Sequence, residues 1–288
     1  MRLASRWLAG AVLAMAALSA MAADAEVDAV AAPAWLVRDG TRMPLAPGER
    51  LRNGDVLDTG PAGRARLRLA DGGTVKLGEN AHFTLGGMAI GAADQVFRAT
   101  LGVVKGAFRY TTAALDRFRG RRAVQVQFVT ASVGIRGTDL WGKSLADREI
   151  VALIEGRVEV TRAGEPPVIM DRPGTWYQAP RSGPALPVQP IADELLARFA
   201  QETEMAPDSA AVSQSGRWRL VVLAAADQAQ AREAYDRLAA GGYPVALRPV
   251  SGRYQVLVDG FDQASTAQAL GQRLRALFGF DQISVVPR

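Results

Sequence analysis

The side chains with the clearest chemical pattern lie between two strand-like segments, in the sequence Arg136-Gly137-Thr138-Asp139. A guanidinium and a carboxylate stand on either side of a glycine, which can adopt a positive φ and let the chain turn sharply. One interpretation is a structural corner, in which Arg136 holds Asp139 or nearby carbonyls and the Thr138 and Asp139 side chains satisfy local amides. The other is a recognition site at a loop tip, where Arg136, Thr138 and Asp139 bind a protein partner. The sequence leaves both open.

No other group of residues has the pattern of a catalytic or metal site. The chain has no cysteine and a single histidine, His82, so it offers no thiolate nucleophile, no disulfide and no histidine cluster for zinc. Arg64, Arg66 and Arg68 alternate with apolar residues and could hold an anion, but a solvated sheet face has the same pattern. We therefore expect no catalytic residues, no metal and no cofactor, and predict that the protein is not an enzyme.

Residues 1–22 have the parts of a secretory signal peptide: Arg2 and Arg6, an apolar run at 7–18, and an A-x-A cleavage signature at 20–22. The apolar run is shorter than the roughly 18 residues that a membrane anchor needs. We expect a cleaved, periplasmic protein with no membrane span, and the lack of cysteine predicts that it is not a lipoprotein. Removing Arg2 and Arg6 leaves 32 Lys and Arg against 29 Asp and Glu, or +3. This small excess predicts no nucleic-acid binding.

The first half of the mature chain has the pattern of a β domain. After a short acidic lead-in at 23–32, residues 33–178 consist of short apolar stretches separated by Gly, Pro, Asn and Asp, which is typical of strands and tight turns. Apolar and polar residues alternate at 64–69 and again at 123–128, so each segment should bury one face. We predict a mostly β domain, built as a sandwich or roll.

The second half divides into a linker and an internal repeat. Residues 179–215 are rich in proline and contain a predicted helix at 190–204, whose apolar stripe should dock on a neighbouring domain. In 216–288, the triplet GRW at 216 recurs as GRY at 252, and DQA at 227 recurs at 262. Each copy has the pattern strand, helix, strand. This predicts a βαββαβ domain of the α+β class, with a four-stranded antiparallel sheet and two helices on one face.

Residues of about 34–178 resemble a FecR domain. The resemblance is carried by the segments GERLRNGDVLDTG, LRLADGGTVKLGENAHFTL, VTASVGIRGTDLWG, LIEGRVEV and RPGTWYQ. Family members usually carry a proline after the threonine, where this chain has Ala131 after Thr130. The resemblance implies a periplasmic, β-rich module. The family takes its name from a regulator that couples an outer-membrane receptor to a sigma factor, but such regulators have a cytoplasmic helical head and a membrane span, which we do not expect here.

Residues 216–288 resemble a SPOR (sporulation-related repeat) domain, through the repeat, GRYQVLVDGF and GGYP. The resemblance implies binding to peptidoglycan glycan strands from which the stem peptides have been removed. The chain departs from the family at two places. The first-strand pattern Gln-x-Gly-x-Phe is replaced by Val221, Leu223 and Ala225, and a glycine of the second copy is replaced by Asp259.

Strand alternation divides the residues of this domain between two sheet faces. The face toward the helices is expected to hold Trp218, Leu220, Val222, Tyr254, Val256 and Val258. The opposite face is expected to hold Arg219, Val221, Leu223, Gln255, Leu257 and Asp259. We predict that glycan binds there, through Arg219, Val221, Leu223, Arg248, Gln255 and Leu257. The alternative is that this face packs on the β domain or the linker helix; the stacking aromatics of a nucleic-acid module are absent from it.

These patterns predict a secreted, non-enzymatic cell-envelope protein with a place in cell division. Its C-terminal domain would bind denuded glycan strands, while its FecR-like domain would bind a partner or ligand. The alternative function is an envelope signalling or scaffold protein, in which the FecR-like domain binds a protein partner and the tail binds no glycan.

Overall fold

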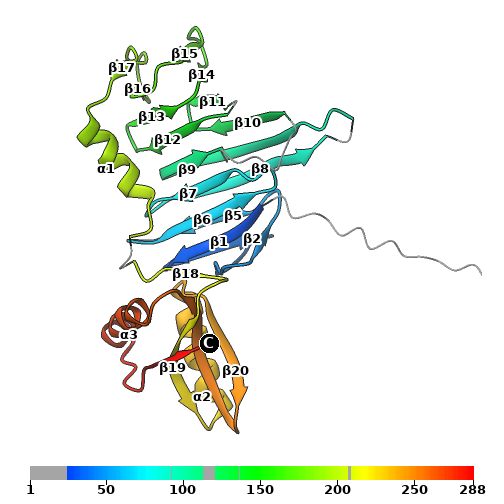
Figure 1. Cartoon of the computed structure of the whole chain (residues 1–288), viewed down its shortest axis with the longest axis vertical. Helices are drawn as coiled ribbons and strands as arrows, with labels where there is room; N and C mark the ends of the chain where they lie inside the picture. Colours follow the sequence, from blue (N-terminus) through cyan, green and yellow to red (C-terminus); the bar gives the residue numbers. More distant parts are fainter. Residues whose placement is uncertain (1–24, 92, 113–120, 136, 207–208) are drawn as a thin grey trace, which may run out of the picture.

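The computed structural model describes residues 25–91, 93–112, 121–135, 137–206 and 209–288. The predicted signal peptide at 1–22 and Arg136 lie outside the described residues. The chain forms two units that meet end to end, an N-terminal unit (25–206) and a C-terminal unit (216–288) (Figure 1). The predicted fold class is confirmed: the first unit is made almost entirely of strands, and the second combines a sheet with two helices.

Two sheets build the N-terminal unit. The first sheet runs through β1 (Ala25–Ala31), β6 (Arg64–Leu69), β7 (Thr74–Leu77), β9 (Phe97–Thr111), β12 (Asp139–Ser144), β13 (Arg148–Glu155), β16 (Thr175–Pro180) and β17 (Gln189–Pro190), with β4 (Arg50–Leu51) beside β1. The second runs through β3 (Thr41–Pro44), β2 (Ala34–Arg38), β5 (Val56–Thr59), β8 (His82–Ile90), β9, β10 (Arg122–Gln127), β11 (Ala131–Ile135), β14 (Val158–Arg162) and β15 (Val168–Met170). The long strand β9 belongs to both sheets and turns between them at Gly106, whose φ is +85°.

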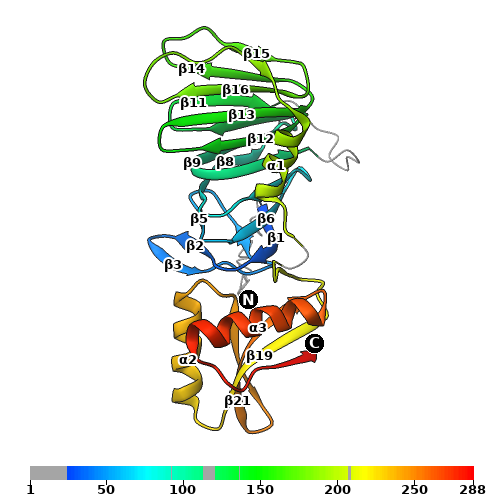
Figure 2. The same cartoon turned by 90° about the vertical axis from the view of Figure 1, so that its left-hand side faces the viewer.

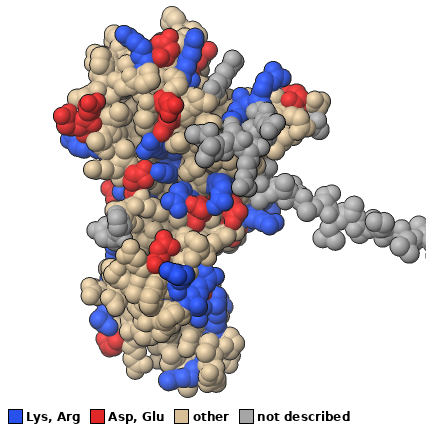
Figure 3. Space-filling view, in the orientation of Figure 1, with Lys and Arg blue, Asp and Glu red and all other residues tan. Residues whose placement is uncertain are grey.

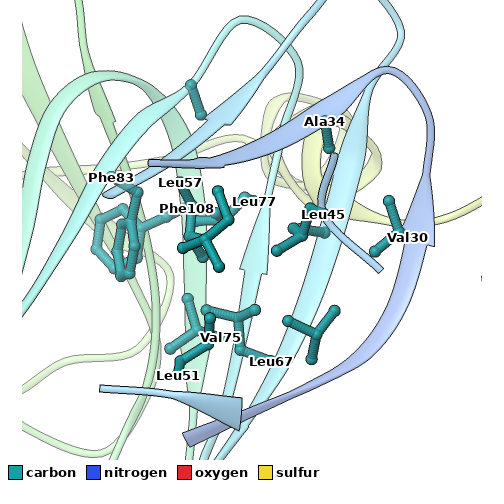
Figure 4. Close-up of a cluster of buried hydrophobic side chains, with 14 of the residues drawn as sticks. Val30, Ala34, Leu45, Leu51, Leu57, Leu67, Val75, Leu77, Phe83 and Phe108 are labelled. Carbon is teal, nitrogen blue, oxygen red and sulfur yellow. The ribbon is translucent and has the colours of Figure 1, made fainter. Parts of the chain in front are cut away.

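Alternation along the strands explains the core between these sheets. In β6, the side chains of Ala65, Leu67 and Leu69 are buried, and the three arginines between them face outward, as the sequence predicts. Leu67 of the first sheet lies in one apolar cluster with Leu57 and Phe83 of the second (Figure 4). Burying such side chains stabilises each by about 1.5–3 kcal/mol.

The predicted lead-in at 23–32 is wrong from Ala25 onward, because that segment forms β1. Ala25 and Val27 point into the core and Glu26 and Asp28 point outward, a period of two that is interrupted by a bulge between Val27 and Ala29. The bulge breaks the alternation after only two repeats, which conceals a strand in the sequence.

The helix predicted at 190–204 is α1 (Asp193–Thr203), and it packs on the outer face of the first sheet (Figure 2). Phe199 stacks on Trp141 of β12, with ring centroids 4.0 Å apart and planes 3° from parallel. Ion pairs join the end of the helix to the sheet: Glu202 with Lys143 at 2.8 Å, and Glu204 with Lys76 at 2.5 Å. Much of the predicted linker is therefore part of the N-terminal unit.

The C-terminal unit is the predicted βαββαβ fold. Its elements are β19 (Trp218–Ala225), α2 (Gln228–Ala240), β20 (Val245–Val250), β21 (Arg253–Phe261), α3 (Ala264–Phe278) and β22 (Ser284–Pro287). The antiparallel sheet has the order β22, β19, β21, β20, and both helices lie on one face. Asp227 caps α2 by accepting a hydrogen bond from the amide of Ala229 at 2.9 Å, which satisfies one of the free donors at the helix start.

The two units join through a short strand, β18 (Val212–Ser213), which pairs with β1 on one side and with β21 on the other. Two more bonds cross the junction: the amide of Ala34 donates to Gly242 O at 3.0 Å, and Trp35 Nε1 donates to Ala240 O at 3.2 Å. These contacts use one end of the C-terminal sheet and the end of α2, so the sheet face opposite the helices points clear of the N-terminal unit (Figure 1).

Candidate functional site

The face of the C-terminal sheet opposite α2 and α3 holds most of the predicted binding residues. Strand register brings these side chains together: Arg219 is opposite Asp259, Val221 is opposite Leu257, and Arg248 is opposite Gln255. We call this surface the open face; its residues are Arg219, Val221, Ala246, Arg248, Gln255, Leu257 and Asp259.

The predicted position of Leu223 on this face is wrong. A bulge between Val221 and Leu223 leaves Val222 as an extra residue in β19 and pairs Leu223 with Val256, whose side chain is buried beneath the helices. An extra residue shifts the alternation by one position and turns every later side chain to the other face. Leu223 consequently lines a groove beside α2, together with Ala234.

Two arginines of the open face share one carboxylate. Arg219 Nε lies 2.5 Å from Asp259 Oδ1, and its Nη2 lies 3.2 Å from Oδ2. Arg248 Nη2 approaches the same Oδ2 at 2.9 Å from the other side. Because two cations meet one anion, this cluster keeps a net positive charge and has the geometry to hold a carboxylate in a bidentate grip.

The Arg248 side chain also covers the apolar centre of the open face. Arg248 is opposite Gln255 in the strand register, yet its guanidinium contacts Asp259. Gln255 and Asp259 are four residues apart in β21, which is roughly 13 Å at the usual strand rise. Leu257 lies between these two positions and is 0% exposed, although neither helix covers that face. The methylene stem of the arginine therefore lies across Leu257, as long cationic side chains commonly cover apolar surface.

The strands of the C-terminal unit present a basic surface on the side shown in Figure 3. Figure 3, which views the molecule as in Figure 1, shows arginine side chains gathered over the strands of the C-terminal unit, which contains no lysine. A positively charged surface attracts an anionic polymer and raises the rate at which it binds.

Asp259 is not among the predicted site residues, although the aspartate replaces a glycine of the family pattern. The signal was present in the strand register, since alternation alone already placed Arg219 and Asp259 on one face. Alternation could not show that Arg248, itself a predicted site residue, pairs with Asp259, because its reach along β21 depends on side-chain conformation.

The second candidate site is the corner at 136–139. Its described residues, 137–139, are held by contacts within the protein. Gly137 has a φ of +82°, as the turn requires. Asp139 is only 9% exposed and accepts two hydrogen bonds from Arg109 of β9, at 2.8 and 2.7 Å. The hydrogen bonds to Asp139 raise the pKa of the Arg109 guanidinium, and this effect exceeds the opposing one of burial.

Thr138 is also buried, at 4% exposure. Its amide donates to Thr112 Oγ1 at 3.0 Å, and its hydroxyl donates to Arg157 O at 3.1 Å. These contacts favour the structural interpretation of the corner for Thr138 and Asp139, while the role of Arg136 remains a prediction.

Three other features bear on function. Among the described residues, no three His, Cys, Asp or Glu side chains come together as metal ligands would. His82 in β8 lies beside Asp58 in β5, with Nδ1 2.7 Å from Oδ1. Within the same part of the chain, no helix combines the length and apolar character needed to cross a membrane.

Two protein families match the chain. Residues 55–159 match the family described as FecR protein, and residues 214–285 match the SPOR domain. These matches confirm both resemblances on which the sequence analysis relied, and both families consist of binding or signalling domains. A search of curated proteins found no match.

Two crystal structures from Parabacteroides distasonis ATCC 8503, each described as a candidate anti-sigma factor, are similar to the chain. The 1.65 Å structure is 14% identical, with a TM-score of 0.41, and the match covers 51% of this chain and 64% of that one. The 2.50 Å structure is 11% identical, also with a TM-score of 0.41, and the match covers 81% of this chain and 97% of that one. This chain thus spans less than two thirds of the first protein.

Proposed function

We propose that this chain, which contains a FecR domain and a C-terminal SPOR domain, is a non-catalytic cell-envelope protein that binds peptidoglycan glycan strands through the open face. The observation that carries the proposal is the cluster of Arg219, Arg248 and Asp259 above the apolar residues Leu257 and Val221. A glycan has apolar sugar faces and polar edges, and this surface offers a matching combination.

The chemistry of a denuded strand explains the two arginines. Cleaving the amide that joins a stem peptide to the lactyl group of its sugar leaves a free carboxylate on that sugar. Arg219 and Arg248 already hold a carboxylate, that of Asp259. In the bound state the lactyl carboxylate takes over one or both guanidinium groups, since a carboxylate and a guanidinium form a strong, directional pair. Arg248 then leaves Leu257, and the sugar ring packs on the exposed side chain.

The FecR domain is proposed as the second functional module. Strand β18 pairs with β1 and with β21, and so joins the FecR domain to the SPOR domain through backbone hydrogen bonds. A glycan bound on the open face would therefore hold the first unit in a defined position. Export through the signal peptide at 1–22 and a periplasmic location belong to this proposal, as does a function in cell division.

The alternative proposal is a signalling or scaffold protein whose FecR domain binds a protein partner. One observation favours it: a groove of about 720 Å³ runs over β10, β11 and β14. Gly134 opens this groove, and Ile169 at its side is 41% exposed. A groove over exposed strands gives a partner's side chains a surface on which to pack.

Co-sedimentation with sacculi tests the proposed function. We expect the protein to sediment with sacculi treated with an amidase, and the double variant Arg219→Gln, Arg248→Gln to bind at least tenfold more weakly. The matched control is Arg232→Gln, which removes an arginine paired with Asp236 on the exposed side of α2. Equal binding by the double variant and the control would refute the assigned face, and no sedimentation of any form would favour the alternative.

A further inference from the structure

A cavity of about 660 Å³ lies on the N-terminal unit, far from the open face. It is bounded by the end of α1 at Glu202, by the turn of β9 at Gly106 and Ala107, and by β12 at Lys143. Apolar side chains contribute to its lining, among them Leu145 and Val104, and Val104 is 46% exposed although it lies in the middle of a strand.

Four cations and two carboxylates line this cavity, and the carboxylates are already engaged. Glu202 pairs with Lys143 at 2.8 Å. Glu79 accepts a hydrogen bond from the amide of Ala62 at 2.8 Å. Within the described part of the chain, the remaining cations Arg64, Lys105 and Arg181 have no carboxylate within ion-pair distance. With four cations against two carboxylates, the lining carries a net charge of +2.

Arg181 is held rigidly at this wall by neutral acceptors. Its Nε and Nη2 donate to Leu145 O at 3.0 and 2.7 Å, and Nη2 also donates to Ser144 Oγ at 3.0 Å. Neutral partners fix the orientation of the guanidinium without cancelling its charge. Preorganised cations of this kind bind an anion without first breaking an ion pair.

Arg64 contributes a second guanidinium to the cavity wall. Its Nη1 donates to Gly63 O at 2.9 Å, but its Nε is buried and has no acceptor in the described structure. Because protein atoms cover Nε, any contact of this guanidinium with a molecule in the cavity is made through its Nη atoms.

The cavity keeps its shape because glycines allow close backbone approach at its edge. A Cβ atom added to Gly78 would lie 2.8 Å from Glu202 O, and one added to Gly106 would lie 2.5 Å from Ala81 Cα. The end of α1 can consequently sit directly against the sheet, and the ion pair between Lys143 and Glu202 holds it there. The wall formed by the helix is built into the fold.

We propose that this cavity binds a small amphiphilic anion, a molecule with one acidic head group and an apolar body. The head group, a carboxylate or a phosphate, lies between Arg64, Lys105 and Arg181. The apolar body packs on Leu145 and Val104. This site lies in the N-terminal unit and does not depend on glycan binding by the open face.

Two fluorescent probes of similar shape test the proposal on the full chain. Anilinonaphthalene sulfonate carries an anionic group, and N-phenyl-1-naphthylamine has the same aromatic body without it. We expect saturable binding of the sulfonate, at least tenfold tighter than binding of the neutral probe, and displacement by decanoate or by decyl phosphate. The stronger competitor identifies the head group.

Variants at Arg64 and Lys105 test whether the sulfonate probe binds in this cavity. Lys105→Gln and Arg64→Gln should each weaken sulfonate binding about tenfold, the loss expected for one charged hydrogen bond. Arg64→Lys should restore part of it. Lys105 is exposed, so its replacement leaves the fold intact, and Arg50→Gln is the control because Arg50 is exposed and does not line the cavity. Equal affinity for the two probes, or binding unchanged in both Gln variants, would overturn the proposal.

Discussion

The guanidinium of Arg248 lies 2.9 Å from the carboxylate of Asp259, although the register of β20 and β21 places Arg248 opposite Gln255. The side chain thus crosses the open face from one end to the other and covers Leu257. In a surface proposed to bind glycan, this contact has two consequences. It presents two arginines already arranged around a carboxylate, and it requires that carboxylate to be displaced before a sugar can reach the apolar residues.

Asp259 should therefore compete with the glycan. We expect Asp259→Asn to bind amidase-treated sacculi about tenfold more tightly than the unmodified chain, a change of about 1.4 kcal/mol. The reason is that both arginines are freed from their ion pairs. Co-sedimentation at several protein concentrations measures the change. Asp236→Asn, which removes a carboxylate from the exposed side of α2, is the control. Weaker binding by Asp259→Asn would show that Asp259 orders the face instead of competing.

Binding should also depend on salt. Exposed charge pairs are screened over about 10 Å at 0.1 M ionic strength and over about 3 Å at 1 M. We expect sedimentation of the unmodified chain to fall steeply between these concentrations. The double variant Arg219→Gln, Arg248→Gln should lose most of this dependence. A salt response of equal steepness in both forms would mean that other basic residues hold the polymer.

The corner that follows β11 should be a structural element stabilised by Arg109. Replacing Arg109 by Met leaves the buried carboxylate of Asp139 without its bidentate partner, and breaking such a pair costs about 3–5 kcal/mol. Urea unfolding should show a loss of this order. The comparison is Arg98→Met, which breaks an exposed pair with Asp94 and should change the unfolding midpoint little. If Arg109→Met left the urea unfolding midpoint unchanged, the corner at 136–139 would not be a stabilising element, and the binding-site interpretation would be favoured instead.

Helix α1 should depend on Phe199 for its position. Phe199 stacks on Trp141 and lies 6.1 Å from the ring of Trp176. We expect Phe199→Ala to lower the free energy of unfolding by about 3–5 kcal/mol and to speed amide hydrogen exchange in α1. Leu277→Ala is the matched control, since that side chain is 63% exposed. Protection of the α1 amides equal to that of the unmodified chain would contradict the role given to the stacked ring.

Asp28 should make stability depend on acid pH. Burial, the largest single influence, raises its pKa, but the hydrogen bonds and charges of Arg66 and Arg68 together outweigh burial and lower it. A carboxylate with a lowered pKa in the folded state stabilises the fold above its unfolded pKa of about 3.9, and this contribution disappears as the pH falls further. The difference in unfolding free energy between the unmodified chain and Asp28→Asn should therefore shrink from pH 6 to pH 3. If this difference in unfolding free energy stayed constant from pH 6 to pH 3, the charged form of Asp28 would not be what stabilises the fold.

Sequence patterns predicted the parts of this protein that depend on local alternation. The buried residues of β6, the stripe on α1 that contains Phe199, and the four strands and two helices of the SPOR domain all follow from period-two or helical spacing. The placement of Arg219 and Val221 on the open face follows in the same way. In each case a side chain's direction is set by its own segment.

The errors arise where the backbone leaves regular geometry. A bulge in β1 concealed a strand, and a second bulge in β19 turned Leu223 to the helix side. Contacts between side chains that are far apart in the chain could not be predicted from the sequence either. The partner of Asp139 is Arg109, thirty residues away in the chain, and nothing between them in the sequence indicates the pair. The cavity with Arg64, Lys105 and Arg181 depends on three separate segments and on the docked end of α1.

Recognition of the lactyl carboxylate by Arg219 and Arg248 is the central feature of the proposed glycan site. Calorimetric titration of the protein with two glycan fragments of equal length would test it, one with free lactyl carboxylates and one in which each is capped as an alanine amide. We predict at least tenfold tighter binding of the free form, about 1.4 kcal/mol or more, with the preference lost in the double variant Arg219→Gln, Arg248→Gln. Equal affinity for the two fragments would contradict the proposed exchange of Asp259 for a glycan carboxylate.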